Sequence, residues 1–371
     1  MAPPQVQTAI IQAEQAEFPA DSLAVVVSHN VPVPTLTSAN QVLVRVLAVA
    51  LNPSDFKMIK YFPRPGTNIP IGCDFCGVVE DTRGDSVLAS FPKGTRVAGT
   101  EFPYGTMVGG SFAQWLVADA SQLLRVPNRL TDLEGAAIGG LCWGTSVVAL
   151  FGDPDALCLP GSLTQPAEKS YPVLVYGAAT ATGTMACQML KLAGHTPIAV
   201  TSVESAPLAV AYGAVGSAPY TSPACAATIR TMAPNGDPIR HALDCITTPE
   251  SAALCFAAIG RAGGRYACLE GFKDEWRTRR AVRTKEVMGF EGFGHKVALG
   301  DNTYSRDQNL QLYSQGRYWS SEMQASLDQG LIKPHPVREV HGEWEGIIEG
   351  LHMLQAGKVR GEKLVIRLGT I

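Results

Sequence analysis

The spacing of hydrophobic and polar residues changes about halfway along the chain. The first half contains short alternating runs, and the longest of them, residues 41–51 (QVLVRVLAVAL), predicts a half-buried strand. Further strands are expected at residues 73–80, 95–100 and 111–117. Short turns separate these runs, so the first half predicts a mostly β domain.

Two helices are expected in this half. Asn52-Pro53-Ser54-Asp55 opens the first, because Asn is a good N-cap and Pro has no N–H to lose at the first helical position. A longer helix is predicted to begin near Thr131 or Asp132. Its residues 135–152 carry no charge and reach the lower length of a membrane span. They include five glycines, which favours a buried helix with a close backbone approach instead.

Strands and helices alternate after residue 170. Residues 172–176 (PVLVY) are wholly apolar, as expected of a strand that is covered on both faces. Further strands are expected at residues 196–200, 216–220, 241–245 and 265–269, with a helix between each pair. The pattern predicts a doubly wound parallel sheet. Near the end, residues 343–356 suit a helix and 363–368 a strand.

Composition restricts the class of protein. A chain of 371 residues with 46% hydrophobic and 17% charged residues suits two globular domains. A net charge of −3 and the absence of a block of Lys and Arg favour neither nucleic acid nor a membrane as partner. The nine scattered cysteines predict reduced thiols in a cytoplasmic protein, and the first residues do not resemble a signal peptide.

The turn after residues 172–176 has the best candidate chemistry. It consists of the small residues 177–183 (GAATATG), which let a backbone approach a pyrophosphate at a helix N-terminus. Ala178, Thr180 and Gly183 occupy the three glycine positions of the dinucleotide motif, so the motif is incomplete. Thr180 and Thr182 can add hydroxyl donors for phosphate. A plain strand–helix turn favours small residues too.

Motifs along nearly the whole chain resemble the medium-chain dehydrogenase/reductase superfamily. They are residues 52–55 (NPSD), 72–79 (GCDFCGVV), 94–97 (GTRV), 110–115 (GSFAQW), 134–138 (EGAAI) and 177–183. A narrower set resembles the trans-acting enoyl reductases of fungal highly reducing polyketide synthases, of the lovastatin type. It comprises residues 174–182, 242–247 (ALDCIT), 255–264 (CFAAIGRAGG) and 361–365 (GEKLV).

The resemblance implies a fold and an activity. The fold is α/β, with a mostly β GroES-like catalytic domain over residues 1–160 and 335–371 and a dinucleotide-binding Rossmann domain over 161–334. The implied protein is a monomer that uses NADPH to reduce an α,β-unsaturated thioester carried on the acyl-carrier domain of a polyketide synthase, in secondary metabolism. A free-standing quinone or enone oxidoreductase and a non-catalytic cofactor-binding partner protein stay open as alternatives.

No metal is expected. The zinc-dependent relatives have Cys in place of Asn52 and a His-Glu pair in place of Cys73 and Asp74, and Asn is a poor zinc ligand. Cys73 and Cys76 form a C-x-x-C pair, but no second pair follows at the spacing of a structural zinc site. Two thiols on a core strand are the favoured interpretation, ahead of a zinc or redox role.

Without a metal, hydrogen bonds and charge must stabilise the enolate that forms when hydride adds to the β-carbon. The resemblance places Lys57 against the cofactor and Thr145 beside the nicotinamide and substrate, so both are predicted to be catalytic. A solvated helix lysine and a hydroxyl bonded back to its helix are the alternatives. Asp55 is also explained as a carboxylate at a helix N-terminus.

The resemblance implies two sets of contacts. The cofactor is expected to contact Ser54, Asp55, Lys57, Thr180, Ala181, Thr182, Gly183, Ser202, Ser205, Tyr220, Leu269, Glu270, Leu364 and Val365. The substrate is expected to contact Thr145, Ser146, Ala149, Phe290, Glu291, Gly292, Phe293 and Gly294, the last five of which also suit a glycine-rich turn. NADPH rests on the resemblance, because Glu204 follows the second strand and no Lys or Arg is near it to neutralise a 2′-phosphate.

Residues 276–285 (WRTRRAVRTK) concentrate five basic side chains. They predict either a solvated basic face or a docking surface for an acidic acyl-carrier domain, with Arg279, Arg280 and Arg283 as the candidate contacts.

Overall fold

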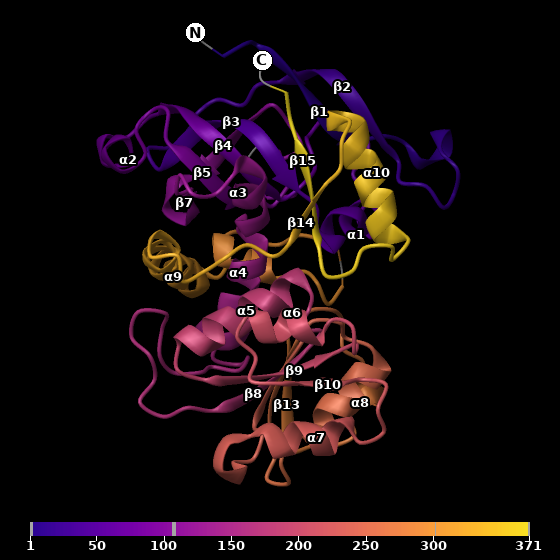
Figure 1. The fold of residues 1–371 in the computed structure, drawn as a ribbon. Helices are drawn as coiled ribbons and strands as arrows, with labels where there is room; N and C mark the ends of the chain where they lie inside the picture. The colour runs from indigo at the N-terminus through magenta and orange to yellow at the C-terminus, as the bar shows by residue number, and fades with distance from the viewer. Residues whose placement is uncertain (1–2, 106–108, 301, 370–371) are drawn as a thin grey trace. The chain divides into compact units, whose positions relative to one another are not determined.

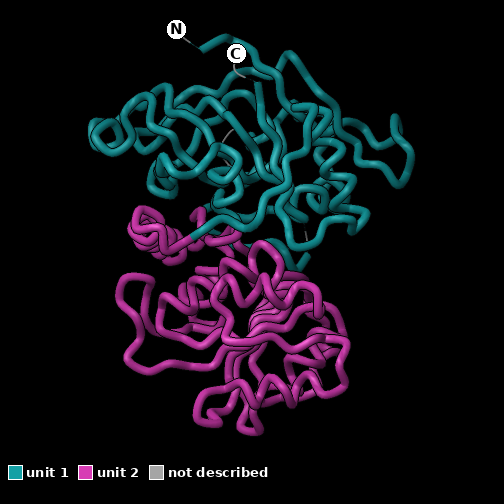
Figure 2. The backbone as a smooth tube through the Cα atoms, in the orientation of Figure 1, with its two compact units in different colours: residues 1–141, 295–308, 333–371 teal, residues 142–294, 309–332 magenta. Residues whose placement is uncertain are grey.

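The computed structural model describes residues 3–105, 109–300 and 302–369 and divides the chain into two compact units (Figure 2). Unit 1 comprises Met1–Leu141, His295–Gln308 and Lys333–Ile371, and unit 2 comprises Cys142–Gly294 and Asn309–Ile332. These limits differ from the predicted domain ranges. Residues 295–308 belong to unit 1 because Arg64 donates to the Ala298 carbonyl at 2.6 Å and the Phe62 and Tyr304 rings meet at 5.8 Å.

Unit 1 is built on a seven-stranded sheet (Figure 1). Its strand order is β14-β15-β3-β4-β5-β7, and β6 pairs with β3. The strands are β3 (Gln41–Ala50), β4 (Asp74–Thr82), β5 (Arg96–Thr100), β6 (Trp115–Asp119), β7 (Leu124–Arg125), β14 (Val337–Glu339) and β15 (Lys363–Arg367), and β1 (Val6–Gln12) pairs with β2 (Val25–Pro32). The C-terminal β15 lies antiparallel to β3, so residues 363–367 and residues 41–50 belong to one sheet.

Three helices of unit 1, α1, α3 and α10, begin where the sequence predicts, and the short α2 was not predicted. In α1 (Pro53–Tyr61), Asn52 and Asp55 form a capping box, and in α3 (Asp132–Ile138), Thr131 and Glu134 form another. The remaining helices are α2 (Asp85–Ser90) and α10 (Glu343–Gln355). Apolar side chains of β3, β4, β6, α10 and β15 form the core.

The prediction of one long helix from residue 131 to 152 is wrong. The chain breaks at Gly139, whose φ is 42°, and continues as α4 (Leu141–Val147) and a π-helical turn (Val148–Gly152). The run Asp132–Gly152 is long and apolar enough to cross a membrane, but 78% of its most apolar window is buried inside the protein. This burial agrees with the interpretation as buried helix.

Unit 2 contains a six-stranded parallel sheet in the order β10-β9-β8-β11-β12-β13. The strands are β8 (Pro172–Tyr176), β9 (Thr196–Thr201), β10 (Ser217–Pro219), β11 (His241–Asp244), β12 (Gly264–Cys268) and β13 (Val282–Glu286). Helices α5 (Ala181–Leu192) and α6 (Ala206–Ala211) cover one face, and α7 (Cys225–Met232) and α8 (Pro249–Ala258) cover the other (Figure 1). The predicted α/β fold is confirmed, and the strand order reverses beside β8, where such sheets bind ligands.

Candidate functional site

The turn that follows β8 is held by the hydroxyl of Thr180. This hydroxyl donates to the Gly177 carbonyl at 2.8 Å and accepts from the Gly183 N–H at 3.0 Å, which caps α5. The single hydroxyl proton of Thr180 is therefore used inside the turn. To donate to a phosphate, as predicted, Thr180 would have to break its bond to the Gly177 carbonyl. The N–H groups of Ala181 and Thr182, at the start of α5, remain the natural anion donors.

Gly183 packs against this turn more closely than any other residue can. A Cβ added at Gly183 would lie 2.3 Å from the Gly177 carbonyl oxygen and 2.7 Å from the Ala178 Cα. The first turn of α5 therefore lies directly on the loop that follows β8. This close approach is what the third glycine of a dinucleotide motif provides.

A second loop at the same edge of the sheet is fixed by Asp244, the last residue of β11. Its Oδ1 accepts from the N–H groups of Ile246 and Thr247, both at 2.9 Å. Its Oδ2 accepts from the Ser251 hydroxyl at 2.5 Å and the Tyr266 hydroxyl at 2.8 Å. Burial raises the pKa of the Asp244 carboxyl, and these donors oppose that shift.

Thr247 connects this loop to two predicted cofactor contacts. Its φ is 60°, and its Oγ1 accepts from the N–H groups of Leu269 at 3.2 Å and Glu270 at 3.3 Å. Neither Asp244 nor Thr247 was predicted to be a site residue. A signal was available, because Asp followed by a Thr three residues later directly after an apolar strand is typical of an Asx turn.

The loop after β9 brings the predicted adenosine contacts together. The Ser202 hydroxyl donates to the Ser205 hydroxyl at 3.2 Å, and Ser205 donates its N–H to the Ser202 hydroxyl at 3.3 Å. Tyr220 follows β10, and its ring lies 6.3 Å from that of Tyr176. Val203, Tyr220 and Ile246 are large apolar residues left exposed after three strands of one sheet edge. Such exposed apolar groups suit a flat aromatic ligand.

The predicted substrate residues of unit 2 divide into buried and accessible ones. Ser146 is buried, and its hydroxyl donates to the Cys142 carbonyl at 2.8 Å. A hydroxyl bonded to a carbonyl of its own helix was the alternative for Thr145, and it is found at the neighbouring Ser146. Thr145 is half-buried, and its hydroxyl lies against Gly289, where an added Cβ would come within 2.3 Å. Ala149, Phe290, Glu291 and Gly294 are buried, and Gly292 and Phe293 are half-buried.

The α1 residues of unit 1 differ in exposure as well. Lys57 and Ser54 are half-buried, so Lys57 is no fully solvated helix lysine. Asp55 is buried, and its Oδ2 accepts from the Asn52 N–H at 2.7 Å in the capping box. This bond fits the alternative explanation of Asp55 as a carboxylate at a helix N-terminus, and its cofactor contact stays a prediction. Burial raises the pKa of Asp55 to about 7, with the Cys73 thiol as a neighbour.

Asn52 and Asp74 share a buried ammonium that the sequence analysis did not anticipate. Lys363, the first residue of β15, donates to Asn52 Oδ1 at 2.6 Å and to Asp74 Oδ2 at 2.8 Å. Asn52 also donates to Asp74 Oδ2 at 2.9 Å. The positions discussed above for zinc thus hold a cation of the chain itself. The predicted Leu364 and Val365 contacts directly follow Lys363 and are buried.

The two thiols of the C-x-x-C pair lie in the core of unit 1. Burial raises the pKa of Cys73 and of Cys76 well above the ordinary value, and both side chains are fully buried. Thiols in this state are poor metal ligands and poor nucleophiles. Within residues 3–105, 109–300 and 302–369, no three His, Cys, Asp or Glu side chains are grouped to hold a metal.

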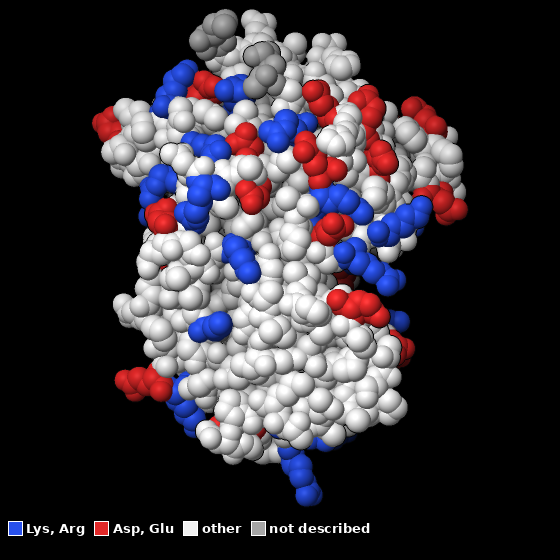
Figure 3. Space-filling view, in the orientation of Figure 1, with Lys and Arg blue, Asp and Glu red and all other residues white. Residues whose placement is uncertain are grey.

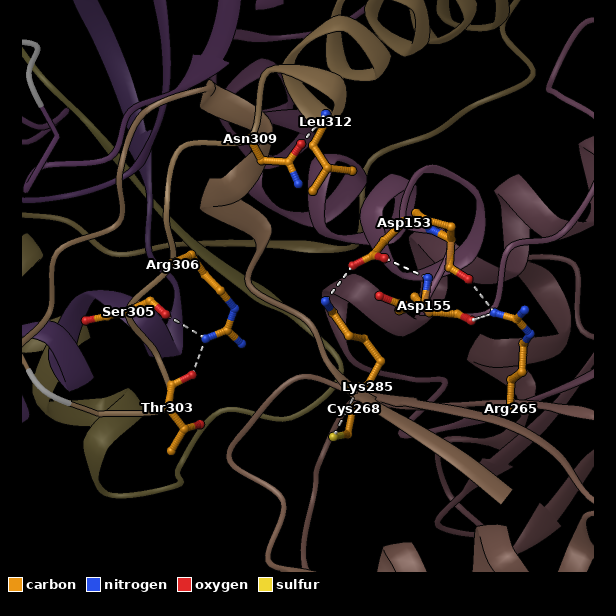
Figure 4. Close-up of polar contacts among 12 residues, drawn as sticks. Asp153, Asp155, Arg265, Cys268, Lys285, Thr303, Ser305, Arg306, Asn309 and Leu312 are labelled. Atoms are coloured by element: carbon orange, nitrogen blue, oxygen red, sulfur yellow. Dashed lines mark hydrogen bonds and ion pairs between the residues drawn. The ribbon is translucent and has the colours of Figure 1, made fainter. Parts of the chain in front are cut away.

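Most of the basic segment has internal partners. Arg279 donates to four carbonyls at the end of α8, Arg277 bonds Asp274 and Thr284, and Lys285 pairs with Asp153 at 2.9 Å (Figure 4). Arg279 therefore caps the end of α8, which favours an internal role for it over the alternative of a docking contact. Arg280 and Arg283 are exposed. The face in Figure 3 has acidic and basic side chains interspersed over unit 1 and few charges over unit 2.

Comparison with known proteins places these features in a wider group. Residues 38–128 match the alcohol dehydrogenase GroES-like domain. The chain is 48% identical to the trans-enoyl reductase sthE of Phaeosphaeria nodorum over 99% of both chains, and 49% identical to the trans-enoyl reductase calK of Penicillium decumbens over 98% of both. It is also similar in fold to the CurK enoyl reductase, with a TM-score of 0.69 and 18% identity over 99% of this chain and 100% of that one.

Proposed function

This chain belongs to the fungal trans-enoyl reductases of the medium-chain dehydrogenase/reductase superfamily, and we propose that it reduces the carbon–carbon double bond of an α,β-unsaturated polyketide thioester held by a polyketide synthase. The observation that supports this most is the close packing at Gly183, at the switch point of a parallel sheet, in a chain similar to trans-enoyl reductases over its whole length.

NADPH is the proposed cofactor. The Ser205 hydroxyl can donate to a 2′-phosphate, the Ser202 hydroxyl can do so once it gives up its bond to Ser205, and the exposed Tyr220 ring can pack on the adenine. Glu204 opposes a phosphate, so the preference depends on hydroxyl donors rather than on a cation. The residues proposed to hold the cofactor are Ser54, Lys57, Thr180, Ala181, Thr182, Gly183, Ser202, Ser205, Tyr220, Leu269, Glu270, Leu364 and Val365.

A bound nicotinamide supplies the hydride that adds to the β-carbon of the thioester. The electron pair of the double bond moves toward the carbonyl oxygen, and the α-carbon then takes up a proton. We assign the Thr145 hydroxyl to donate a hydrogen bond to the substrate and the Lys57 ammonium to act as an electrostatic anchor. The buried groups of Ser146, Ala149, Phe290 and Glu291 are proposed to shape the substrate wall, together with Gly292, Phe293 and Gly294.

The direct test is to mix the purified protein with NADPH and a pantetheine-linked α,β-unsaturated thioester, and to follow cofactor absorbance. Oxidation of NADPH with formation of the saturated thioester is expected. Turnover of quinones or simple enones without turnover of the thioester would favour the free-standing oxidoreductase. Binding of NADPH without any turnover would favour the non-catalytic partner protein. A clear preference for NADH would overturn the cofactor assignment.

The proposed partner is the acyl-carrier domain of a polyketide synthase, met by a cytoplasmic monomer. Arg280 and Arg283 are the cations of the basic segment proposed to steer the acidic carrier domain. Exchanging both for Ala should raise KM for a carrier-bound substrate several-fold and leave KM for the pantetheine thioester unchanged. An equal change of KM for the carrier-bound substrate and for the pantetheine thioester would show that this surface is not the docking site. Sedimentation of the free protein tests the monomer.

A further inference from the structure

The buried ammonium of Lys363 bonds Asn52, which precedes α1, and bonds Asp74, which in turn accepts from the N–H group of Leu141 at the start of α4. We propose that Lys363 is a positioning residue for the reduction, because its ammonium fixes the relative places of the start of α1, the start of α4 and the start of β15. This inference rests on the proposed function and adds a residue that acts through its neighbours rather than on the reacting atoms.

The contacts of Asp74 show how complete the cluster is. Its Oδ1 accepts from the N–H groups of Gly140 and Leu141, both at 3.0 Å, and its Oδ2 accepts from Asn52 and Lys363. A carboxylate offers about four acceptor sites, so Asp74 is fully used. Asp74 is 0% exposed and Lys363 is 3% exposed. The charges therefore compensate each other out of contact with water.

Each partner of this cluster begins a segment with a proposed role. Asn52 precedes the turn of α1 with Ser54 and Lys57, and its Oδ1 is held by the ammonium. Leu141 is the first residue of α4, the helix that carries Thr145. Lys363 precedes the two proposed β15 contacts. One residue before Asn52, the Leu51 N–H donates to the Leu364 carbonyl at 2.9 Å, which brings β15 directly against the start of α1.

Geometry, rather than stability, explains a lysine at this position. The rest of β15 is apolar where it is buried, and an apolar side chain of similar volume in place of a buried ion pair often leaves stability unchanged or higher. An ion pair with directed hydrogen bonds fixes the position of β15 along its neighbours, which apolar packing alone does not do. Burial lowers the pKa of His335, and the charge of the Lys363 ammonium lowers it further.

The test compares three variants of the full-length protein by unfolding temperature, Kd for NADPH and kcat on the pantetheine thioester. Lys363→Met leaves the Asp74 carboxylate buried and unpaired, and both unfolding temperature and kcat should fall. In Lys363→Met with Asp74→Asn, both charges of the ion pair are removed, and the new amide can still accept from Gly140 and Leu141. Lys358→Met, which removes an exposed lysine before β15, is the matched control and should behave as wild type.

The double variant decides between positioning and a merely structural role. We expect its unfolding temperature to return to within a few degrees of wild type, while kcat stays at least ten-fold low and Kd for NADPH stays raised. Recovery of kcat and Kd together with the unfolding temperature would overturn the inference. If the single variant does not fold, the double variant alone still gives this answer.

Failure of the proposed function gives a different result. If the wild-type protein binds NADPH and reduces no thioester, the proposed function is contradicted. The role of Lys363 is then tested by Kd for NADPH alone. In that case an unchanged Kd in the double variant overturns the inference about Lys363, and a raised Kd supports it.

Discussion

Gly183→Ala is the sharpest test of the proposed nucleotide turn. A Cβ in ordinary contact stays at least 3.4 Å from its neighbours, but at Gly183 it would lie 2.3 Å from one backbone atom and 2.7 Å from another. The turn and α5 would therefore have to separate by about 1 Å. Overpacking of this kind costs about 1–3 kcal/mol, and the helix propensity of Ala returns at most about 1 kcal/mol. We expect a net loss of about 1–2 kcal/mol in the free energy of unfolding.

The same substitution at Gly144 is the matched control. Gly144 lies in α4, and an added Cβ there meets nothing within 4 Å. Gly144→Ala should therefore leave the free energy of unfolding unchanged or raise it by up to about 1 kcal/mol. Urea unfolding measures both variants, and NADPH fluorescence measures cofactor affinity, which should fall at least ten-fold for Gly183→Ala alone. Equal urea midpoints and equal affinities for the two variants would refute the argument.

Three further predictions follow from contacts within a unit. The pKa of Asp55 is about 7 in the folded chain and near 4 in the unfolded chain. The protonated carboxyl therefore stabilises the folded state fully below pH 4, and this contribution to the free energy of unfolding, up to about 4 kcal/mol, is lost as the pH rises to 7. Asp55→Asn should flatten this part of the pH–stability curve, and an unchanged slope would contradict the raised pKa. Gly289→Ala should lower the free energy of unfolding by about 1–3 kcal/mol through its clash with the Thr145 hydroxyl, and adding Thr145→Ala should recover most of that loss in the same urea titration. Arg279→Ala should lower the free energy of unfolding by about 2–3 kcal/mol, and Arg280→Ala should lower it by less than about 0.5 kcal/mol. Similar urea midpoints for the two variants would show that Arg279 does not stabilise the end of α8.

Strands and caps could be predicted from the sequence because their causes are local. The alternation of residues 41–51 predicted β3 to within one residue, and the capping boxes at Asn52 and Thr131 fixed where α1 and α3 begin. The break at Gly139 could not be predicted in this way. Its cause is Asp74, which accepts from the N–H groups that follow the break and lies far away in the sequence.

In the candidate site too, contacts between residues close in the sequence could be predicted, and contacts between distant residues could not. Residues 177–183 were found because the turn and its packing partner lie within one short motif. The Asn52–Asp74–Lys363 cluster was missed because its ion pair joins residues separated by 289 positions. The charge count of residues 276–285 could not decide between a solvated basic face and a docking surface, for a related reason. A count of basic residues does not show that the Arg279 guanidinium is used by the carbonyls of α8.

The incomplete dinucleotide motif can now be explained by what each position does. The left-handed residue of this turn is Gly177, with a φ of 72°, so Ala178 needs no unusual backbone. At position 180 a hydroxyl bonds both the Gly177 carbonyl and the Gly183 N–H, which a glycine cannot do. Of the three motif positions 178, 180 and 183, only 183 lacks room for a Cβ, and only there is the glycine kept. The departures from glycine therefore preserve the turn, and they give no reason to prefer a protein without catalysis.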